Sequence, residues 1–360
     1  MNLAPFLDDL QRRIDPEGEA RLMREWRAFA NLELQEGFFA PTRTPAPPGI
    51  EWKPILINDA LQSDTLMLYH QLYQISEMLR TGSGEILCLR SNYGTGIIPS
   101  MFDAEVFIMP AHTDTLPGIR TLTGGKADIQ AIIASGNMDF TKGFASRVFT
   151  TGELYLESVR AYPELRDHVY YYNPDLQGPF SLCEVMWGSQ CFMEFYDDPD
   201  TVEQALDFFA DVVIAYLKKW HGLIPPVDAG HSIEWGCLHK GHIIIRNDTA
   251  TNVSGDMYSE FVMPRDQKII DVFGGGIHFC GKGDHYIEHL SNMPGLSCVN
   301  ISQPDWNNME KIYRHTVDKD IIIFGLHSDE VTRATTEGRP LRGRVQRGAS
   351  AAAWLDKKDI

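Results

Sequence analysis

The apolar run HIII (residues 242–245), the helical pattern that follows it over residues 254–272, and the run GIHFC (276–280) decide the fold. Both runs have the length of buried strands, and the segment between them spaces its apolar residues at helical intervals. Two more runs follow at 296–301 and 321–324, with another helical pattern between them. Short strands separated by helices are typical of parallel β-α-β units. This half of the chain therefore predicts a parallel sheet covered by helices.

Similar runs lie earlier in the chain and are also separated by helical patterns. The predicted strands are 54–57, 86–90, 104–109 and 168–172, and the predicted helices are 64–79 and 201–220. About eight such units fit a (β/α)8 barrel better than an open doubly wound sheet, and no G-x-G-x-x-G motif follows the first strand. We therefore expect an α/β protein with a single (β/α)8 TIM barrel over residues 50–360. Residues 1–49 are expected to form a helical lead-in and a Pro-rich linker.

The charge of the chain argues against two classes of partner. Its 32 Lys and Arg and 49 Asp and Glu give a net charge of −17, which repels nucleic-acid phosphates and anionic lipid surfaces. No apolar run approaches the ~18 residues of a membrane-spanning helix, and the N-terminus lacks the pattern of a secretory signal. The six cysteines form no C-x-x-C pair and are typical of free thiols in a reducing compartment. We expect a cytoplasmic protein that acts on a small molecule and binds neither nucleic acid nor membranes.

The segment GGGIHFCGKG (274–283) carries the strongest candidate for chemistry. Side chains two positions apart on a strand share a face, so His278 and Cys280 are expected to point the same way. At the carboxyl end of a barrel strand that face opens into the mouth, where barrel enzymes hold their active sites. An imidazole beside a thiolate is half of a zinc site. The alternative is a buried His and Cys that only fill the barrel interior.

Three other segments carry polar side chains that could serve a site. Asp248 could accept a substrate proton, bind a ligand N–H or support a metal-bound histidine, or it could form only a loop cap or a salt bridge to Arg246. Asn92 and Tyr93 follow a predicted strand, beside two glycines, and are expected to face the mouth and line the pocket. Glu234 lies in a stretch crowded with aromatic, Cys and His residues, which a mixture of core and surface positions explains as well.

Several segments, taken in order, resemble the uroporphyrinogen decarboxylase superfamily of (β/α)8 barrels. The matching segments are 98–110, 178–182, 198–199, 247–264 and 276–281. Their order and spacing carry the resemblance, which extends from about Asn58 to the C-terminus.

This superfamily includes the cofactor-free decarboxylase of haem biosynthesis and zinc-dependent, corrinoid-linked methyltransferases. In the methyltransferases a His-x-Cys pair and a later Cys bind a zinc that activates a thiol as methyl acceptor, and His278-x-Cys280 resembles that pair. The resemblance therefore implies zinc, a thiol substrate, and a corrinoid as co-substrate, carried by a corrinoid protein. No cysteine follows Cys298 in the chain, so the third ligand stays open. The candidates for it are Cys298, His327, Glu234 and Asp248.

Two other functions remain open on the sequence. A decarboxylase of uroporphyrinogen or a related tetrapyrrole would use Arg246, Arg342 and Arg344 as anion contacts, with Asp248 facing the pyrrole N–H donors. The chain reads WKPILIND over residues 52–59, where that enzyme carries an arginine-rich motif. The other possible function is binding of a corrinoid by a barrel that catalyses no reaction. Barrels of this type include homodimers, and the sequence is compatible with one.

Overall fold

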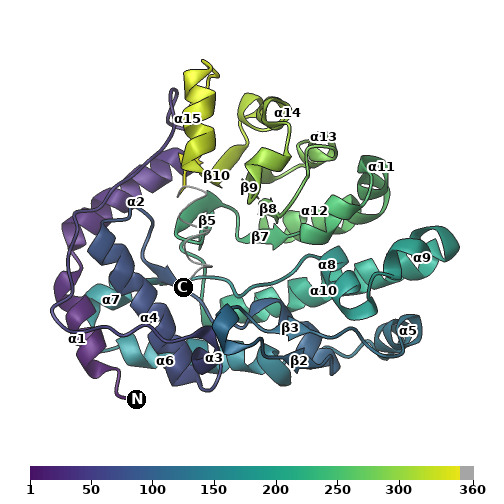
Figure 1. Cartoon of the computed structure of the whole chain (residues 1–360), viewed down its shortest axis with the longest axis horizontal. Helices are drawn as coiled ribbons and strands as arrows, with labels where there is room; N and C mark the ends of the chain where they lie inside the picture. Colours follow the sequence, from purple (N-terminus) through teal and green to yellow (C-terminus); the bar gives the residue numbers. More distant parts are fainter. Residues whose placement is uncertain (349–360) are drawn as a thin grey trace.

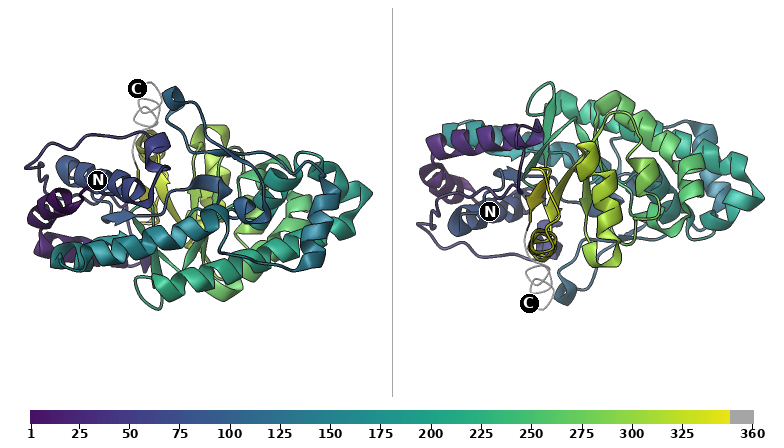
Figure 2. Two further views of the ribbon diagram at one scale, coloured as in Figure 1. Left: turned by 90° about the horizontal axis from the view of Figure 1, so that it is seen from below. Right: turned by 90° about the horizontal axis from the view of Figure 1, so that it is seen from above.

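Parallel strands form the centre of the molecule, with helices around them, as the alternation of apolar runs predicts (Figures 1 and 2). The computed structural model describes residues 1–348. Its strands are β1 (Cys88–Leu89), β2 (Val106–Phe107), β3 (Gly118–Ile119), β4 (Tyr170–Tyr171), β5 (His231–Glu234), β6 (Cys237–Lys240), β7 (Ile243–Arg246), β8 (Gly275–Phe279), β9 (Leu296–Ile301), β10 (Ile322–Leu326) and β11 (Val345–Arg347). The strands β7 to β11 form one parallel sheet in the order β11-β10-β9-β8-β7, and β1 pairs with β4 in parallel.

The helices account for most of the remaining ordered chain. The α-helices are α1 (Ala4–Arg13), α2 (Pro16–Ala30), α3 (Ile57–Ala60), α4 (Asp64–Thr81), α5 (Lys126–Ser135), α6 (Gly143–Val159), α7 (Pro163–His168), α8 (Pro179–Trp187), α9 (Cys191–Asp197), α10 (Pro199–Leu223), α11 (Gly255–Met257), α12 (Met263–Phe273), α13 (Ile287–Leu290), α14 (Met309–His315) and α15 (Ser328–Thr336). A 3-10 helix (Asp248–Asn252) follows β7, and a π-helix (Tyr258–Val262) joins α11 to α12. The 3-10 helix lies at the end of β7 and contains the candidate site residue Asp248.

The register of the strands arranges the inward side chains in rows. The upper row contains Arg246, His278 and Asn300, and the row below it contains Ile244, Gly276, Cys298 and Ile322. The alternate residues, such as Ile277 and Val299, face outward into the large core that the helices share. Side chains alternate between the two faces of a strand, so the sequence places a polar row at the carboxyl ends of the strands above an apolar row.

A hairpin formed by β5 and β6 packs on this inward face. Its turn is Trp235-Gly236, in which both residues have positive φ, 49° and 77°, as a type I′ hairpin turn requires. Such a conformation costs a non-glycine residue on the order of 1 kcal/mol. Packing offsets this cost, because the Trp235 ring lies 5.3 Å from the His278 ring and His239 stacks on Phe324 at 6.4 Å. The hairpin therefore fills the space that the strands enclose below the upper row.

The second N-terminal helix, α2, packs against the same buried cluster as the hairpin. Trp26 of α2 is buried and its Nε1 donates to the Gly84 carbonyl at 2.9 Å. The rings of Phe29 and Phe39 stack at 4.6 Å, and Phe39 forms a parallel bridge with Gln346 of β11. The predicted helical lead-in is thus present as α1 and α2. The division of the chain into residues 1–49 and 50–360 stays a prediction.

The α/β class is confirmed, but a closed (β/α)8 ring is not. Within residues 1–348 the parallel strands fall into two sheets, and a single parallel bridge between Gln177 and Arg246 connects the chain after β4 to β7. The predicted strand 104–109 was wrong as a barrel strand, because β2 pairs antiparallel with β3. The predicted strand 54–57 was also wrong, since α3 begins at Ile57 and Pro54 cannot donate a ladder hydrogen bond.

Close packing of β8 on β9 gives a first prediction. A Cβ at Gly276 would lie 2.3 Å from the Cys298 carbonyl oxygen and 2.6 Å from Cys298 Sγ. We expect Gly276→Ala to lower the free energy of unfolding by about 1–3 kcal/mol, because the strands must separate to admit the methyl group. Gly222→Ala is the matched control, since nothing lies within 4 Å of its new Cβ and alanine favours the helix. Urea denaturation of both variants measures the difference, and equal stabilities would contradict the packing described.

Candidate metal centre

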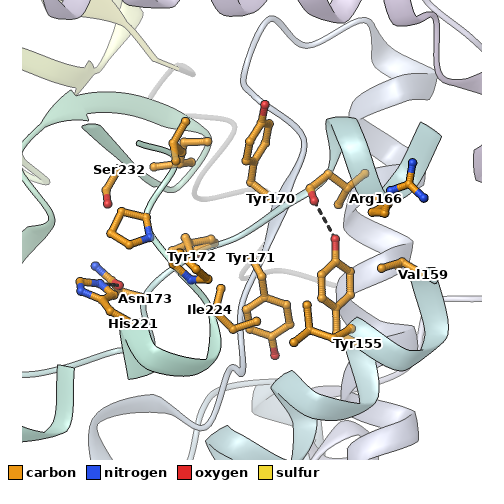
Figure 3. Close-up of a pocket in the computed structure, with 16 residues that line it drawn as sticks. Tyr155, Val159, Arg166, Tyr170, Tyr171, Tyr172, Asn173, His221, Ile224 and Ser232 are labelled. Atoms are coloured by element: carbon orange, nitrogen blue, oxygen red, sulfur yellow. Dashed lines mark hydrogen bonds between the residues drawn. The ribbon is translucent and has the colours of Figure 1, made fainter. Parts of the chain in front are cut away.

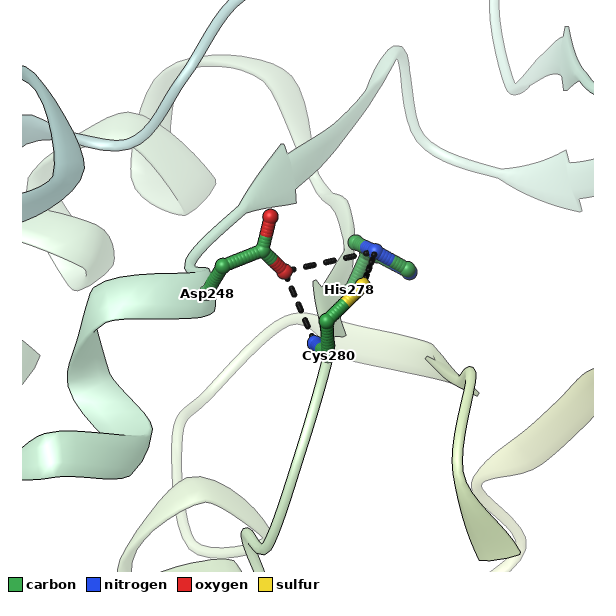
Figure 4. Close-up of side chains that lie close together, drawn as sticks. All are labelled: Asp248, His278 and Cys280. Carbon is green, nitrogen blue, oxygen red and sulfur yellow. Dashed lines mark hydrogen bonds and ion pairs between the residues drawn. The ribbon is translucent and has the colours of Figure 1, made fainter. Parts of the chain in front are cut away.

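Three side chains suited to binding a metal converge where β7 and β8 end (Figure 4). His278 lies near the end of β8, Cys280 follows that strand, and Asp248 begins the 3-10 helix after β7. His278 Nε2 lies 3.2 Å from Cys280 Sγ and 3.4 Å from Asp248 Oδ1. One ligand atom from each residue lies within 4.8 Å of the other two. The expectation that His278 and Cys280 share a face is confirmed, and Asp248 joins them.

Asn300 fixes which nitrogen of His278 faces the other two ligands. Asn300 Nδ2 donates to the Phe324 carbonyl at 2.7 Å, so Asn300 Oδ1 is the atom 2.6 Å from His278 Nδ1. That oxygen can only accept, hence Nδ1 carries the proton and Nε2 presents its lone pair to Cys280 and Asp248. This arrangement is the one that metal-ligating histidines use. Gly325 permits it, because a Cβ there would lie 2.8 Å from Asn300 Nδ2.

The protonation states of the group favour a cation. Burial lowers the pKa of His278, which keeps the imidazole neutral. Burial, and then the Asp248 carboxylate, raise the pKa of Cys280 to about 12. The thiol therefore stays protonated at neutral pH unless a positive charge stabilises the thiolate. Asp248 Oδ1 accepts a hydrogen bond from the Cys280 N–H at 2.7 Å. A divalent cation would stabilise the thiolate and the carboxylate together, and nitrogen, sulfur and oxygen are ligands that zinc accepts. The residues present therefore fit zinc.

A buried ionic network lies beside the group. The Arg246 guanidinium is 2.9 Å from Asp175 through Nε and 2.9 Å from Glu234 through Nη2. It also lies over the Trp235 ring, with Cζ 4.7 Å from the centroid. Arg90 contacts the other oxygen of Asp175 at 3.4 Å. The alternative from the sequence, a salt bridge between Arg246 and Asp248, is not formed. The Arg246 guanidinium binds Asp175 and Glu234 instead, and Asp248 lies with His278 and Cys280.

Of the four candidates for the third ligand, only Asp248 lies beside His278 and Cys280 within residues 1–348. Cys298 faces inward, but it lies one row below His278, opposite Gly276 and among apolar side chains. Glu234 is fully buried and is bound by Arg246. His327 precedes α15 and does not join the group. Cys298, Glu234 and His327 therefore do not join the predicted pair, and within residues 1–348 the group contains only Asp248 beside it.

Asn92 and Tyr93 lie where the chain turns after β1, since the Tyr93 N–H donates to the Ser91 carbonyl at 3.1 Å. Ser91 and Tyr93 bond to the outer helices: Ser91 Oγ donates to the Val148 carbonyl, and the Tyr93 hydroxyl lies 2.9 Å from Asp64 and 2.7 Å from Thr151. The Tyr93 hydroxyl thus faces α4 and α6 instead of the ligand group. The buried Oδ1 of Asn92 has no hydrogen-bond partner within residues 1–348, and its place in a pocket stays a prediction.

The arginines required by a tetrapyrrole decarboxylase are engaged elsewhere. Arg246 is held by Glu234 and Asp175, and Arg344 by Asp320 and the Leu34 carbonyl. Arg342 lies at the surface and its ion-pair contact is with Asp318. The structure thus does not gather these arginines around Asp248.

A separate cavity of about 300 Å³ lies beside β4 and the end of α10 (Figure 3). Tyr155, Tyr172, Asn173 and His221 are among the residues that line it. None of the candidate site residues does. The cavity borders the ionic network through Asn173, which donates to Glu234 at 3.1 Å, and through Tyr172, whose ring faces the Arg90 guanidinium. The ligand group, whose Asp248 side chain is 40% exposed, opens to solvent independently of this cavity.

The role of Asn300 gives a second prediction. Asn300→Leu removes the acceptor for His278 Nδ1–H, and we expect zinc affinity to fall by roughly 10–100-fold, the usual cost of losing such a partner. Asn300→Asp keeps an acceptor in place and should stay much closer to the wild type. Competition with a chromophoric chelator measures both affinities. Equal affinity of wild type and Asn300→Leu would contradict this role.

Comparison with known proteins agrees with these features. Residues 175–337, which contain β7, β8 and the ligand group, match the family model of uroporphyrinogen decarboxylase (URO-D). The match spans less than half of the chain, and over these residues it bears out the resemblance of the sequence to the uroporphyrinogen decarboxylase superfamily. Enzymes are found in this superfamily, among them methyltransferases.

Two curated relatives are methylcobamide:CoM methyltransferases MtbA. The protein of Methanosarcina mazei is 26% identical over 133 residues, which cover 35% of this chain and 34% of the relative. That of Methanosarcina acetivorans is 24% identical over 174 residues, which cover 46% of each. The chain thus matches between about a third and a half of their length.

Among solved structures, a B12-independent methionine synthase from Shewanella sp. W3-18-1, in complex with selenomethionine, is 9% identical, with a TM-score of 0.42 over 91% of this chain and 93% of that chain. Within residues 1–348, none of the helices is both long enough and apolar enough to cross a membrane.

Proposed function

We propose that the protein is a zinc-dependent methyltransferase that moves a methyl group from a corrinoid to the sulfur of a small thiol. The observation that carries the proposal is the convergence of His278 Nε2, Cys280 Sγ and Asp248 Oδ1 at the carboxyl ends of β7 and β8. Catalytic zinc sites combine three protein ligands with one open position. The similarity to methylcobamide:CoM methyltransferases supports the corrinoid as co-substrate.

The side chains have distinct roles in this reaction. Zinc, when bound by His278, Cys280 and Asp248, supplies the charge that keeps a substrate sulfur ionised at neutral pH. Asn300 holds the His278 ring and its tautomer. Within residues 1–348 no hydrogen bond engages Asp248 Oδ2, so this oxygen can accept the proton that the thiol releases. The new S–C bond forms as the Co–C bond breaks, and the electron pair of that bond stays on the cobalt.

The proposal is tested by incubating the zinc-loaded protein with methylcobalamin and a panel of thiols that includes coenzyme M and 2-mercaptoethanol. We expect an S-methylated product by mass spectrometry, together with loss of the methylcobalamin absorbance. Chelation should stop the reaction, and added zinc should restore it. Cys298→Ser is the control variant that should stay active, because Cys298 lies outside the ligand group. Failure of the zinc-loaded protein to methylate any thiol would overturn the proposal.

A further inference from the structure

A second polar cluster lies buried behind the candidate metal centre. It contains Asn247 at the end of β7, Tyr258 of the π-helix, Asp266 of α12 and Tyr286 before α13, all fully buried. The two tyrosine rings lie 4.7 Å apart. A π-helix is rare and often marks a functional position. Because Asn247 precedes Asp248 directly, this cluster adjoins the turn that carries the third ligand.

The contacts of Asp266 are unusual for an ionised carboxylate. Asn247 Nδ2 lies 2.6 Å and the Tyr258 hydroxyl 3.1 Å from the same oxygen, Oδ2. Within residues 1–348, Asp266 Oδ1, Asn247 Oδ1 and the Tyr286 hydroxyl have no hydrogen-bond partner. No basic side chain forms an ion pair with Asp266 in this part of the chain, since the adjacent Arg265 turns away to Glu203 and Asp207. A buried charge without a counter-charge is strongly destabilising.

A proton on Asp266 would remove the unpaired charge and account for the short contact with Asn247. A separation of 2.6 Å is short for an N–H···O bond but usual for O–H···O. An O–H···O bond forms if the Asn247 amide presents its oxygen to a protonated Asp266 carboxyl. This orientation of the amide has nearly the same shape as the reversed one. Burial raises the pKa of Asp266 to about 8, although the Tyr258 hydrogen bond acts in the opposite direction. The neutral form is then the main form at neutral pH.

We propose that Asp266 is a protonated positioning residue that binds the Asn247 side chain and thereby fixes the turn on which Asp248 presents its carboxylate. The Asn247 N–H donates to the His278 carbonyl at 2.8 Å, so the same residue joins β7 to β8 at the site. Loss of the Asp266 proton would place an unpaired anion behind this turn. This inference rests on the proposed zinc site. The role of Asp266 is to set how strongly that site binds zinc.

The proton is tested on the metal-free protein by measuring Tm against pH for wild type and Asp266→Asn. A carboxyl whose folded pKa lies above its unfolded value stabilises the fold at low pH, and this contribution is lost as pH rises towards the folded pKa. Wild type should therefore lose several degrees of Tm relative to Asp266→Asn between pH 5 and pH 8. Asp271→Asn, an exposed position on the same helix, should follow the wild-type curve. Parallel curves for wild type and Asp266→Asn would overturn the proton assignment.

The positioning role is tested by zinc titration against a chelator at pH 7. Asp266→Asn should bind zinc within a few-fold of wild type, whereas Asp266→Leu, which has no hydrogen bond for Asn247, should bind roughly 10-fold more weakly or worse. Wild-type affinity in Asp266→Leu would overturn the role. If Asp266→Leu does not fold, Tyr258→Phe takes its place in the test. Tyr258→Phe should weaken zinc binding and shift the pH range over which Tm falls to higher pH. Zinc affinity and a Tm curve equal to those of wild type would overturn the role. If wild type binds no zinc, the proposed function and this role fail together, while the Tm curves still decide the proton.

Discussion

Replacing Arg246 with Met is expected to destabilise the protein by about 3–5 kcal/mol, the usual cost of removing one partner from a buried ionic group. Arg246 is 2% exposed and neutralises two carboxylates, Glu234 and Asp175. Met fills much of the same volume, so the loss arises from the carboxylates that stay buried and not from a cavity. Urea denaturation gives the change in the free energy of unfolding.

The pH dependence distinguishes this explanation from a packing defect. Burial raises the pKa of Glu234, and Arg246 opposes this rise; without Arg246 the pKa rises further. Both carboxyl groups would then take up protons as the pH falls, so the penalty should be smaller at pH 5 than at pH 8. Arg80→Met is the surface control and should cost under about 1 kcal/mol, because Arg80 pairs with Glu77 in solvent. A penalty for Arg246→Met that does not vary with pH would contradict the explanation.

Replacing a ligand should nearly abolish zinc binding. We expect His278→Ala and Cys280→Ser each to lower zinc affinity by more than about 100-fold, which exceeds the usual effect of losing an outer partner such as Asn300. His278→Ala removes the only nitrogen of the group, and Cys280→Ser replaces the thiolate with a much weaker ligand. Chelator competition with purified variants measures both.

Cys298→Ser is the matched control for Cys280→Ser. Cys298 is buried, faces inward and is opposite Gly276 one row below the site, so its replacement should leave zinc affinity within a few-fold of wild type. If Cys298→Ser lost zinc as completely as Cys280→Ser, the register of β8 and β9 would not explain which thiol binds the metal. The thermal stability of each variant serves to separate loss of the site from loss of the fold.

Local periodicity predicted the parts of this structure that depend on one strand at a time. The runs 242–245, 276–280 and 296–301 became β7, β8 and β9, and the two-residue spacing placed His278 and Cys280 together. Asp248 could not be singled out among the candidates in this way, because its position relative to His278 and Cys280 depends on the pairing of β7 with β8. The same limit applies to Asn300, which sequence reasoning did not consider and which only the β8–β9 register reveals.

Other features differ in whether the sequence carried a signal for them. For Tyr93 it carried none, because β1 ends at Leu89 and the chain turns between Ser91 and Tyr93, so strand alternation does not place this side chain. The β5–β6 hairpin was also missed. Its alternation and its Trp-Gly turn were visible, but the sequence does not show that a tryptophan adopts φ of 49° there. That conformation is tolerated because Trp235 packs against His278 and Arg246, which only the tertiary structure brings to it.

The central claim is that His278, Cys280 and Asp248 bind one zinc ion. Zinc analysis combined with X-ray absorption at the zinc edge, on protein purified without added metal, tests it most directly. We expect about one zinc per chain, with a single sulfur ligand near 2.3 Å and nitrogen or oxygen ligands near 2.0–2.1 Å. A protein that holds no zinc and takes none up, or a zinc bound by two sulfurs or by none, would contradict it.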